Sequence, residues 1–292
     1  MRTKNIFPTT FLFLLLASGS IFGCTRMSID MVGAPMVSAM INNITETKSV
    51  RLAKEGLAGQ VLMITALTEM SPDNLRLLKE CAFIYCAYGL FVEDEDPEYA
   101  KELYSIGKEY GIRALKQNIQ FKEALESGKR LSEIASIPGK EYSEILCWTA
   151  MNGGLLIILN LDDPEALMDM EDIVALMKRS IDLDDTYYFG TGKIFMAAYY
   201  AMMPSYMGLG GGVKNSTELF KDARSITNGR FLLADLFEAR FLAVSIDDEE
   251  LFENKINDVL SADSHSLKEA SLINELSKLK ARYYLDHIDK YF

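Results

Sequence analysis

The apolar residues of this chain recur at helical spacing along nearly its whole length, and no segment alternates as a half-buried strand does. An amphipathic helix is expected from residue 36. Further helices are expected over 49–69, 73–92, 97–117, 141–160, 164–183, 187–203, 214–227, 231–245, 248–261 and 267–290. Proline follows Ser71, Asp96 and Asp163, which is the chemistry of helix starts. Residues 118–140 predict short helices and a loop, so the fold class is all-α.

Four of these helices carry small or apolar residues at steps of four, three and five, the ladder of the second helix in a tetratricopeptide hairpin. The ladders are Ala100, Tyr104, Gly107, Ile112; Ile173, Met177, Ser180, Asp185; Ser216, Phe220, Ala223, Asn228; and Phe252, Ile256, Val259, Ser264. The turn proline of the consensus is missing from each ladder. The pattern therefore predicts stacked antiparallel hairpins in a tetratricopeptide-like (TPR-like) superhelix, whose concave surface serves a partner or ligand.

The N-terminus has the composition of an export signal. Arg2 and Lys4 precede an uncharged stretch that contains the compact apolar run FLFLLLA. Cys24 follows a small residue, Gly23, at the position of a lipoprotein cleavage site, so residues 1–23 are predicted to be a lipoprotein signal peptide and Cys24 to be lipidated. Ordinary secretion and a retained membrane anchor are the alternatives. Residues 24–35 are predicted to tether the lipid to a single domain over residues 36–292.

Charge and residue counts exclude several functions. Removing residues 1–23 takes away two basic residues and leaves 28 basic against 42 acidic, a net charge of −14. Such a surface repels nucleic acid and anionic lipid, so a membrane contact depends on the lipid at Cys24. With two histidines in the chain, we expect no cofactor and no metal site. Cys81, Cys86 and Cys147 are interpreted as buried small hydrophobes, although a bridge to Cys147 is the alternative.

Two helix faces are candidate walls of a ligand or partner cleft. Trp148, the single tryptophan, shares a face with Asn152, beside Gly153 and Gly154, which indicate that a helix or a ligand packs very close. The alternative for Asn152 is a hydrogen bond to a neighbouring carbonyl.

The second wall is predicted at Tyr199 and Tyr206, whose rings suit an apolar site with one polar tip. Arg230 and Arg240 could meet a carboxylate of a substrate or partner. An internal acid is the alternative for both, and Asp235 and Glu238 are near in sequence.

Several segments together resemble the T-component of tripartite ATP-independent periplasmic (TRAP) transporters over residues 50–292. They are Tyr104–Leu115 (YSIGKEYGIRAL), Cys147–Ala150, Asp182–Asp185, Pro204–Gly212 with Leu219–Ala223, Asn228–Leu232 and the ending Asp286–Phe292. The resemblance implies a helical, TPR-like periplasmic lipoprotein that associates with the solute-binding subunit, forms a homo-oligomer and holds an apolar ligand in a cleft.

Three functions follow from these patterns. The first is a non-enzymatic transporter subunit on the periplasmic face of a bacterial membrane. The outer membrane is favoured because Thr25 stands at the position after Cys24 where an aspartate would mark retention in the inner membrane. The second is a scaffold of an outer-membrane assembly complex, and the third a helical hydrolase with paired carboxylates. The acids at 141, 144, 162 and 163 cluster at helix starts, where carboxylates stabilise the helix N-terminus, which disfavours the hydrolase.

Overall fold

The computed structural model describes residues 26–203 and 211–292, and every regular element within these ranges is a helix. The signal peptide, Cys24 and Tyr206 lie outside the described residues. The α-helices are α2 (Ala34–Thr45), α3 (Val50–Met70), α4 (Leu75–Val92), α5 (Pro97–Leu115), α6 (Ile119–Glu126), α7 (Leu131–Ile134), α8 (Ser143–Ile158), α9 (Pro164–Met168), α10 (Met170–Leu183), α11 (Tyr187–Met202), α12 (Val213–Thr227), α13 (Leu233–Phe237), α14 (Glu249–Ser261) and α15 (Ser271–Asp286). Two π-helical turns, η1 (Ile29–Gly33) and η4 (Glu238–Ala243), and 3₁₀ turns η2 (Lys140–Tyr142), η5 (Lys268–Ala270) and η6 (Ile288–Lys290) complete the list.

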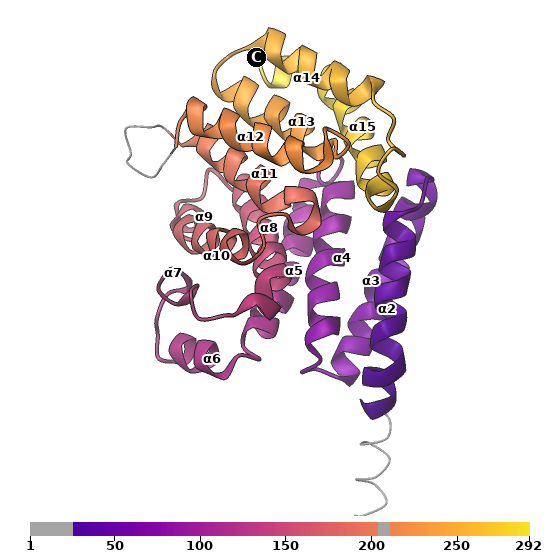
Figure 1. Cartoon of the computed structure of the whole chain (residues 1–292), viewed down its shortest axis with the longest axis vertical. Coiled ribbons are helices and arrows are strands. Elements are labelled where there is room, and N and C mark those ends of the chain that lie inside the picture. The colour runs from indigo at the N-terminus through magenta and orange to yellow at the C-terminus, as the bar shows by residue number, and fades with distance from the viewer. Residues whose placement is uncertain (1–25, 204–210) are drawn as a thin grey trace, which may run out of the picture.

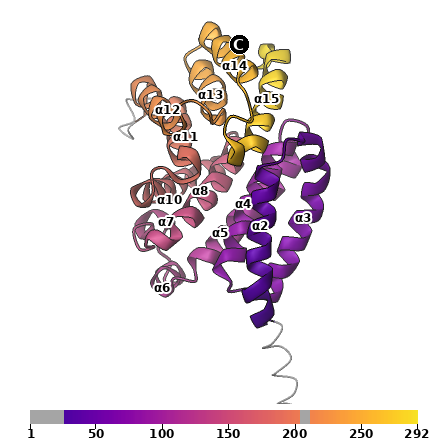
Figure 2. The ribbon, with the colours of Figure 1, turned by 45° about the vertical axis from the view of Figure 1, so that its right-hand side comes forward.

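Consecutive helices pack in adjacent pairs, α3 with α4, α4 with α5, α11 with α12 and α14 with α15. Helix α8 is central, because it contacts α4, α5, α10 and α11. The last long helix, α15, returns to contact α2 and α3, so the C-terminal pairs close against the N-terminal ones (Figures 1 and 2). The prediction of an all-α fold is confirmed for the described residues.

Side-chain caps set several helix starts as the sequence predicts. Asp96 accepts from the backbone N–H of Tyr99 at the start of α5, and Asp163 accepts from that of Glu165 at α9. Helix α4 begins two residues later than predicted. Asn74 rather than Ser71 caps it, by accepting from the N–H of Leu77.

Most ladder positions of the predicted hairpins lie inside the protein, although the turn positions Asp185 and Asn228 are exposed. Tyr104, Met177, Phe220 and Ile256, one from each ladder, are fully buried, in clusters that run through both halves of the chain. The apolar spacing therefore identifies the inward faces of α5, α10, α12 and α14 correctly.

The chain is helical from Arg26, so the described part of the predicted tether is helical. Ile29 and Ala34 on this helix are buried against the rest of the protein. Among the described residues, no helix has the length and apolar content needed to cross a membrane.

Candidate functional site

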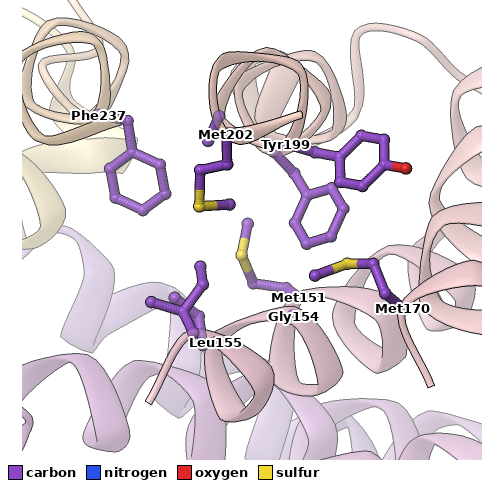
Figure 3. Close-up of a pocket in the computed structure, with 10 residues that line it drawn as sticks. Met151, Gly154, Leu155, Met170, Tyr199, Met202 and Phe237 are labelled. Atoms are coloured by element: carbon purple, nitrogen blue, oxygen red, sulfur yellow. The ribbon is translucent and has the colours of Figure 1, made fainter. Parts of the chain in front are cut away.

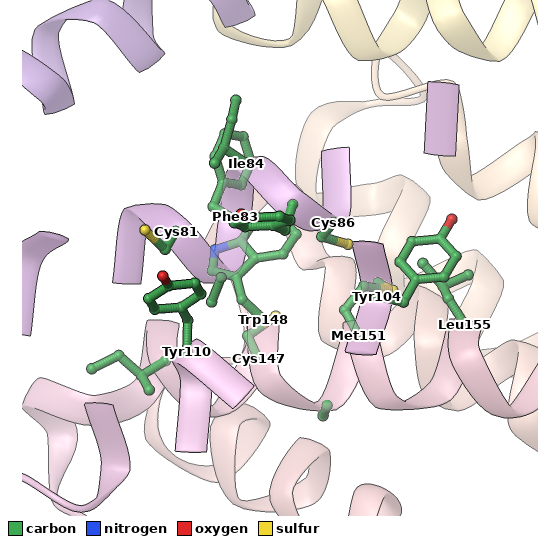
Figure 4. Packing of buried hydrophobic residues seen from close by; sticks show 14 of the residues in the cluster. Cys81, Phe83, Ile84, Cys86, Tyr104, Tyr110, Cys147, Trp148, Met151 and Leu155 are labelled. Atoms are coloured by element: carbon green, nitrogen blue, oxygen red, sulfur yellow. The ribbon is translucent and has the colours of Figure 1, made fainter. Parts of the chain in front are cut away.

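Trp148 lies in an aromatic cluster between α4, α8 and the start of α11. The residue is 5% exposed, and its ring meets that of Phe83, with centroids 4.8 Å apart (Figure 4). The ring centroids of Tyr188 and Tyr187 lie 5.0 and 6.2 Å away. The indole Nε1 donates to the hydroxyl of Tyr187 at 2.8 Å. The predicted cleft residue is thus held by three rings and one hydrogen bond.

Asn152 is completely buried one turn further along α8. Its amide Nδ2 donates to the carbonyl oxygens of Ala82 on α4 and of Trp148, both at 2.8 Å. Its Oδ1 is buried with no hydrogen-bond partner in the structure. The hydrogen bond to a neighbouring carbonyl is therefore the observed role, and it joins α8 to α4.

The glycines beside Asn152 allow close helix packing. A Cβ on Gly153 would lie 2.3 Å from Ile173 of α10, and one on Gly154 would lie 2.2 Å from Phe195 of α11. Both distances are far shorter than a van der Waals contact. The close approach indicated by the sequence is therefore made by neighbouring helices.

Four spaces follow one another past Trp148 and Tyr199, and we call them the cavity line. A mouth pocket of about 260 Å³ shares Phe83, Trp148 and Tyr188 with a first inner cavity of about 20 Å³. That cavity shares Met151 and Phe237 with a second one of about 20 Å³.

The second inner cavity in turn shares Met170 and Tyr199 with an outer groove of about 1050 Å³. Figure 3 shows Met151, Met170 and Met202 meeting around the second cavity. Each inner cavity has room for about one water molecule. The cavity line is therefore open at both ends and nearly filled by side chains in the middle.

Tyr188 stands between the mouth pocket and the first inner cavity in a strained backbone. Tyr188, Phe189 and Gly190 have φ values of 42°, 62° and 81°, the left-handed region that disfavours residues with a Cβ. The ring is partly exposed, yet its hydroxyl oxygen is buried without a hydrogen-bond partner. Burial raises the pKa of this hydroxyl, so it stays a protonated donor. Strain and an unsatisfied donor coincide at one residue of the cavity line.

Of the three predicted cleft residues that the structure describes on these two faces, the cavity line brings together two. Trp148 lines the mouth and the first cavity, Tyr199 lines the second cavity and the groove, and Asn152 lies on the same helix as Trp148. The arginines lie elsewhere. Arg230 donates to the carbonyl oxygens of Thr227 and Ser266 and lines none of the four spaces.

Arg240 belongs to a buried ionic cluster, the Glu93 cluster, made of Glu93, Asp94, Tyr104, Arg240, Lys280 and Tyr284. Glu93 at the end of α4 accepts from Arg240 of η4 at 2.9 Å, from Lys280 of α15 at 2.8 Å and from the Tyr104 hydroxyl at 2.6 Å. Lys280 also donates to Asp94 at 2.6 Å. Two acids face two bases, and each charged group has a partner.

The charges of this cluster stabilise one another. Burial alone would raise the pKa of Glu93, but the positive charges of Lys280 and Arg240 outweigh it and lower that pKa to about 2. Burial also opposes the charge of Lys280, whose pKa is nevertheless raised by Glu93. The cluster is therefore ionised at neutral pH and holds α4, η4 and α15 together. The partner of Arg240 is therefore an internal acid, Glu93, which is the alternative that the sequence analysis gave for this arginine.

Asp235 and Glu238, the acids near Arg230 and Arg240 in sequence, pair with other basic residues. Asp235 and Glu238 both accept from Arg224 and both lie within 3.4 Å of Lys255. They form a second ionic cluster between α12, α13, η4 and α14, separate from Arg230 and from Arg240.

The three described cysteines are free and buried, as interpreted from the sequence. Burial raises the pKa of Cys81 and of Cys147 to about 12, and it also raises that of Cys86. These thiols are therefore unreactive at neutral pH. Across residues 26–203 and 211–292, no group of His, Cys, Asp and Glu side chains is arranged to hold a metal ion.

Sequence reasoning missed Tyr188, Glu93 and Lys280. The left-handed backbone at Tyr188 has no signal in the sequence beyond the following Phe189-Gly190 pair. Glu93 begins the acidic run EDED, which has the composition of a solvated turn, and its partner Lys280 is 187 residues away. Only the tertiary fold makes these residues neighbours.

Two comparisons with known proteins bear on this site. A family model described as the TRAP transporter T-component matches residues 46–292. A search of curated proteins found no match.

Proposed function

The chain belongs to the TRAP transporter T-component family, and from that premise we propose that it is a non-enzymatic accessory subunit of such a transporter. In this proposal it associates with the periplasmic solute-binding subunit and holds an apolar or carboxylate ligand in the cavity line. The match over residues 46–292 is the observation that carries the proposal, because it includes every helix from α3 to α15.

We propose that the stacked pairs form a TPR-like superhelix. Consecutive helices pack side by side, and the ladder residues of α5, α10, α12 and α14 are buried between pairs. This arrangement supports binding of a partner through an extended surface rather than chemistry at one centre.

The cavity line supports a ligand with an apolar body and one acceptor group. The two inner cavities are lined by apolar side chains apart from Tyr188, Tyr199 and Thr191. Methionines make up much of the second cavity, and their unbranched chains can move aside to admit a ligand. A carboxylate at the mouth would then accept the hydroxyl hydrogen that Tyr188 leaves unused.

The anchor proposal rests on the sequence around Cys24. We propose that residues 1–23 are removed and that lipid on Cys24 anchors the mature protein to a bacterial membrane. The protein then lies on the periplasmic face of that membrane, and the outer membrane is favoured over the inner one. Residues 24–35 then connect this lipid to the domain of residues 36–292, and the functional unit is a homo-oligomer.

The experiment is a binding assay between the mature chain and the purified solute-binding subunit of a TRAP transporter from the same bacterium. We expect a stable complex by size-exclusion chromatography. Cys24→Ala should release the chain from the membrane fraction or leave the precursor uncleaved. An unrelated periplasmic binding protein is the control. If the chain instead elutes alone and copurifies with an outer-membrane assembly complex, the transporter role is wrong.

A further inference from the structure

The first helix exposes a row of large apolar side chains on the side that faces away from the protein. Met27, Met31, Val32 and Met36 are 62, 65, 65 and 54% exposed. We call these four residues the N-terminal stripe. Such a row on a single helix is unusual, since exposed apolar side chains are normally scattered.

The π-helical turn η1 explains why Met31, Val32 and Met36 face outward. The N–H of Ala34 donates to the carbonyl of Ile29, five residues back, so one turn holds an extra residue. Ile29 and Ala34 consequently lie one above the other on the buried side. With its inward residues fixed in this way, the helix turns Met31, Val32 and Met36 outward.

Met31, Val32 and Met36 lie on a segment without charge, and the charged residues near Met27, Arg26 and Asp30, are bound within the protein. Residues 31–45 contain no ionisable side chain, in a chain where a quarter of the residues are charged. Helix α3 differs, because its exposed Leu52, Leu62 and Met70 are ten and eight residues apart and form no such closely spaced row. The stripe is therefore a surface that can leave water without removing a charge from it.

Two hydrogen-bonded groups fix the stripe relative to the body of the protein. Arg26 pairs with Asp73 at 2.8 Å. Asp30 accepts from Ser71 and Asn74 at 2.6 Å each. All three partners lie in the turn between α3 and α4. Whatever the stripe contacts therefore sets the orientation of the whole helical body.

We propose that the N-terminal stripe lies in the surface of the lipid membrane, with its helix along the membrane plane. This inference rests on the proposed lipidation of Cys24. Met27 is three positions after Cys24, a span of at most about 10 Å, so the lipid brings the stripe to the membrane surface. Apolar side chains of a helix at this position are buried among the lipid headgroups and upper acyl chains.

Charge and size favour the membrane over a protein partner. The mature chain carries a net charge of −14, which opposes contact with anionic lipid over most of its surface, whereas the stripe does not. Four side chains on one helix are also far fewer than the roughly 20 residues a side of a stable protein interface. A second copy of this chain is accordingly the weaker occupant.

The test places a fluorescent label on the stripe of the lipidated protein in vesicles of phosphatidylethanolamine and phosphatidylglycerol. Met31→Cys and Met36→Cys supply the thiols, because Cys81, Cys86 and Cys147 are buried and unreactive. The matched control is Met168→Cys on α9, which is 72% exposed and lies across the molecule from α2 in Figure 1. An environment-sensitive nitrobenzoxadiazole label reports water or lipid at each position.

We expect the labels at 31 and 36 to shift their emission to shorter wavelength and to be quenched by spin-labelled lipid, while the label at 168 does neither. Equal, water-like emission at all three positions would overturn the inference. Protection of the label at 31 without vesicles, in a species of twice the mass, would also overturn it and identify a second copy as the occupant.

A failure of the anchor is recognised separately. If Cys24→Ala partitions into detergent and migrates in electrophoresis as the wild type does, the lipidation proposal is wrong whatever the labels report. The same labelled variants are then tethered by a hexahistidine tag at position 24 to nickel-chelating lipid. Quenching at 31 and 36 in that arrangement supports the stripe without the native lipid, and its absence overturns the stripe.

Discussion

Two buried regions, the Glu93 cluster and the cavity line, lie between the first and second halves of this chain. They differ in how far their polar groups have hydrogen-bond or ion-pair partners. In the Glu93 cluster, each charged side chain has a partner of opposite charge within 3 Å. Along the cavity line, the Tyr188 hydroxyl is buried without a partner and small voids remain, and the Oδ1 of Asn152, on the same helix as Trp148, is also unpartnered. A cluster whose charged groups are all paired fixes one arrangement of the helices. A region with unpartnered polar groups and voids allows its side chains to rearrange.

The difference indicates a division of roles. Helices α4, η4 and α15 meet at the Glu93 cluster, so a rigid contact there keeps the two halves in register. The cavity line lies between the same halves but contains flexible methionines and a strained turn. We therefore expect stability to depend on the first region and ligand binding on the second.

The largest expected effect is on stability, from Glu93→Gln. The variant leaves Arg240 and Lys280 partly unpaired in the interior, and breaking a buried ion pair costs about 3–5 kcal/mol of unfolding free energy. Glu95→Gln, two residues away, is the matched control. Glu95 is exposed and pairs with Lys54, so its loss costs less than about 1 kcal/mol. Denaturant unfolding followed by circular dichroism measures both.

A second variant separates lost attraction from uncompensated charge. Adding Lys280→Met to Glu93→Gln removes the cation that the first change leaves behind, so the pair should be more stable than Glu93→Gln alone. If Glu93→Gln is as mild as Glu95→Gln, the cluster does not hold the two halves together and the proposed contrast fails.

Smaller changes in the free energy of unfolding, of opposite sign, are expected when two glycines are replaced by alanine. Gly190→Ala puts a Cβ on a residue with φ 81°, 2.5 Å from Ile226, and should cost about 1–2 kcal/mol. Gly59→Ala lies in the exposed interior of α3, where the Cβ meets nothing within 4 Å, and should stabilise by about 0.5–1 kcal/mol. Thermal unfolding of both variants compares the strained turn with an ordinary helix.

An unchanged or raised stability of Gly190→Ala would mean that the turn of Tyr188, Phe189 and Gly190 has an unstrained alternative. The cavity line would then lack the backbone feature that distinguishes it from the rest of the fold.

The sequence predicts the helices better than the site, for physical reasons. Periodicity and caps such as Asp96 act within one turn, so helix faces and starts follow from local pattern. The role of Asn152 was one of two open alternatives, since only the fold decides whether a carbonyl such as that of Ala82 lies within reach. Glu93 and Lys280 are neighbours only in space, and the backbone at Tyr188 is imposed by the packing around it.

The smallest effect is also the most specific, because it separates stability from binding at one atom. Tyr188→Phe removes a buried hydroxyl that has no partner, so the free energy of unfolding should rise by about 1 kcal/mol. Tyr187→Phe is the matched control. Its hydroxyl accepts from Trp148, and its loss should lower the free energy of unfolding by a similar amount.

Ligand binding should respond to Tyr188→Phe in the opposite direction. Palmitate serves as the probe, since it combines an apolar chain with a carboxylate, and the single tryptophan, Trp148, reports binding by its fluorescence. A hydrogen bond to a charged group contributes about 1.5–3 kcal/mol, so Tyr188→Phe should weaken binding about tenfold or more while it stabilises the fold. If Tyr188→Phe destabilises the protein and binds palmitate as the wild type does, the hydroxyl already has a partner such as water. The polar end of the ligand must then be bound elsewhere, and the contrast between the two buried regions would rest on the voids alone.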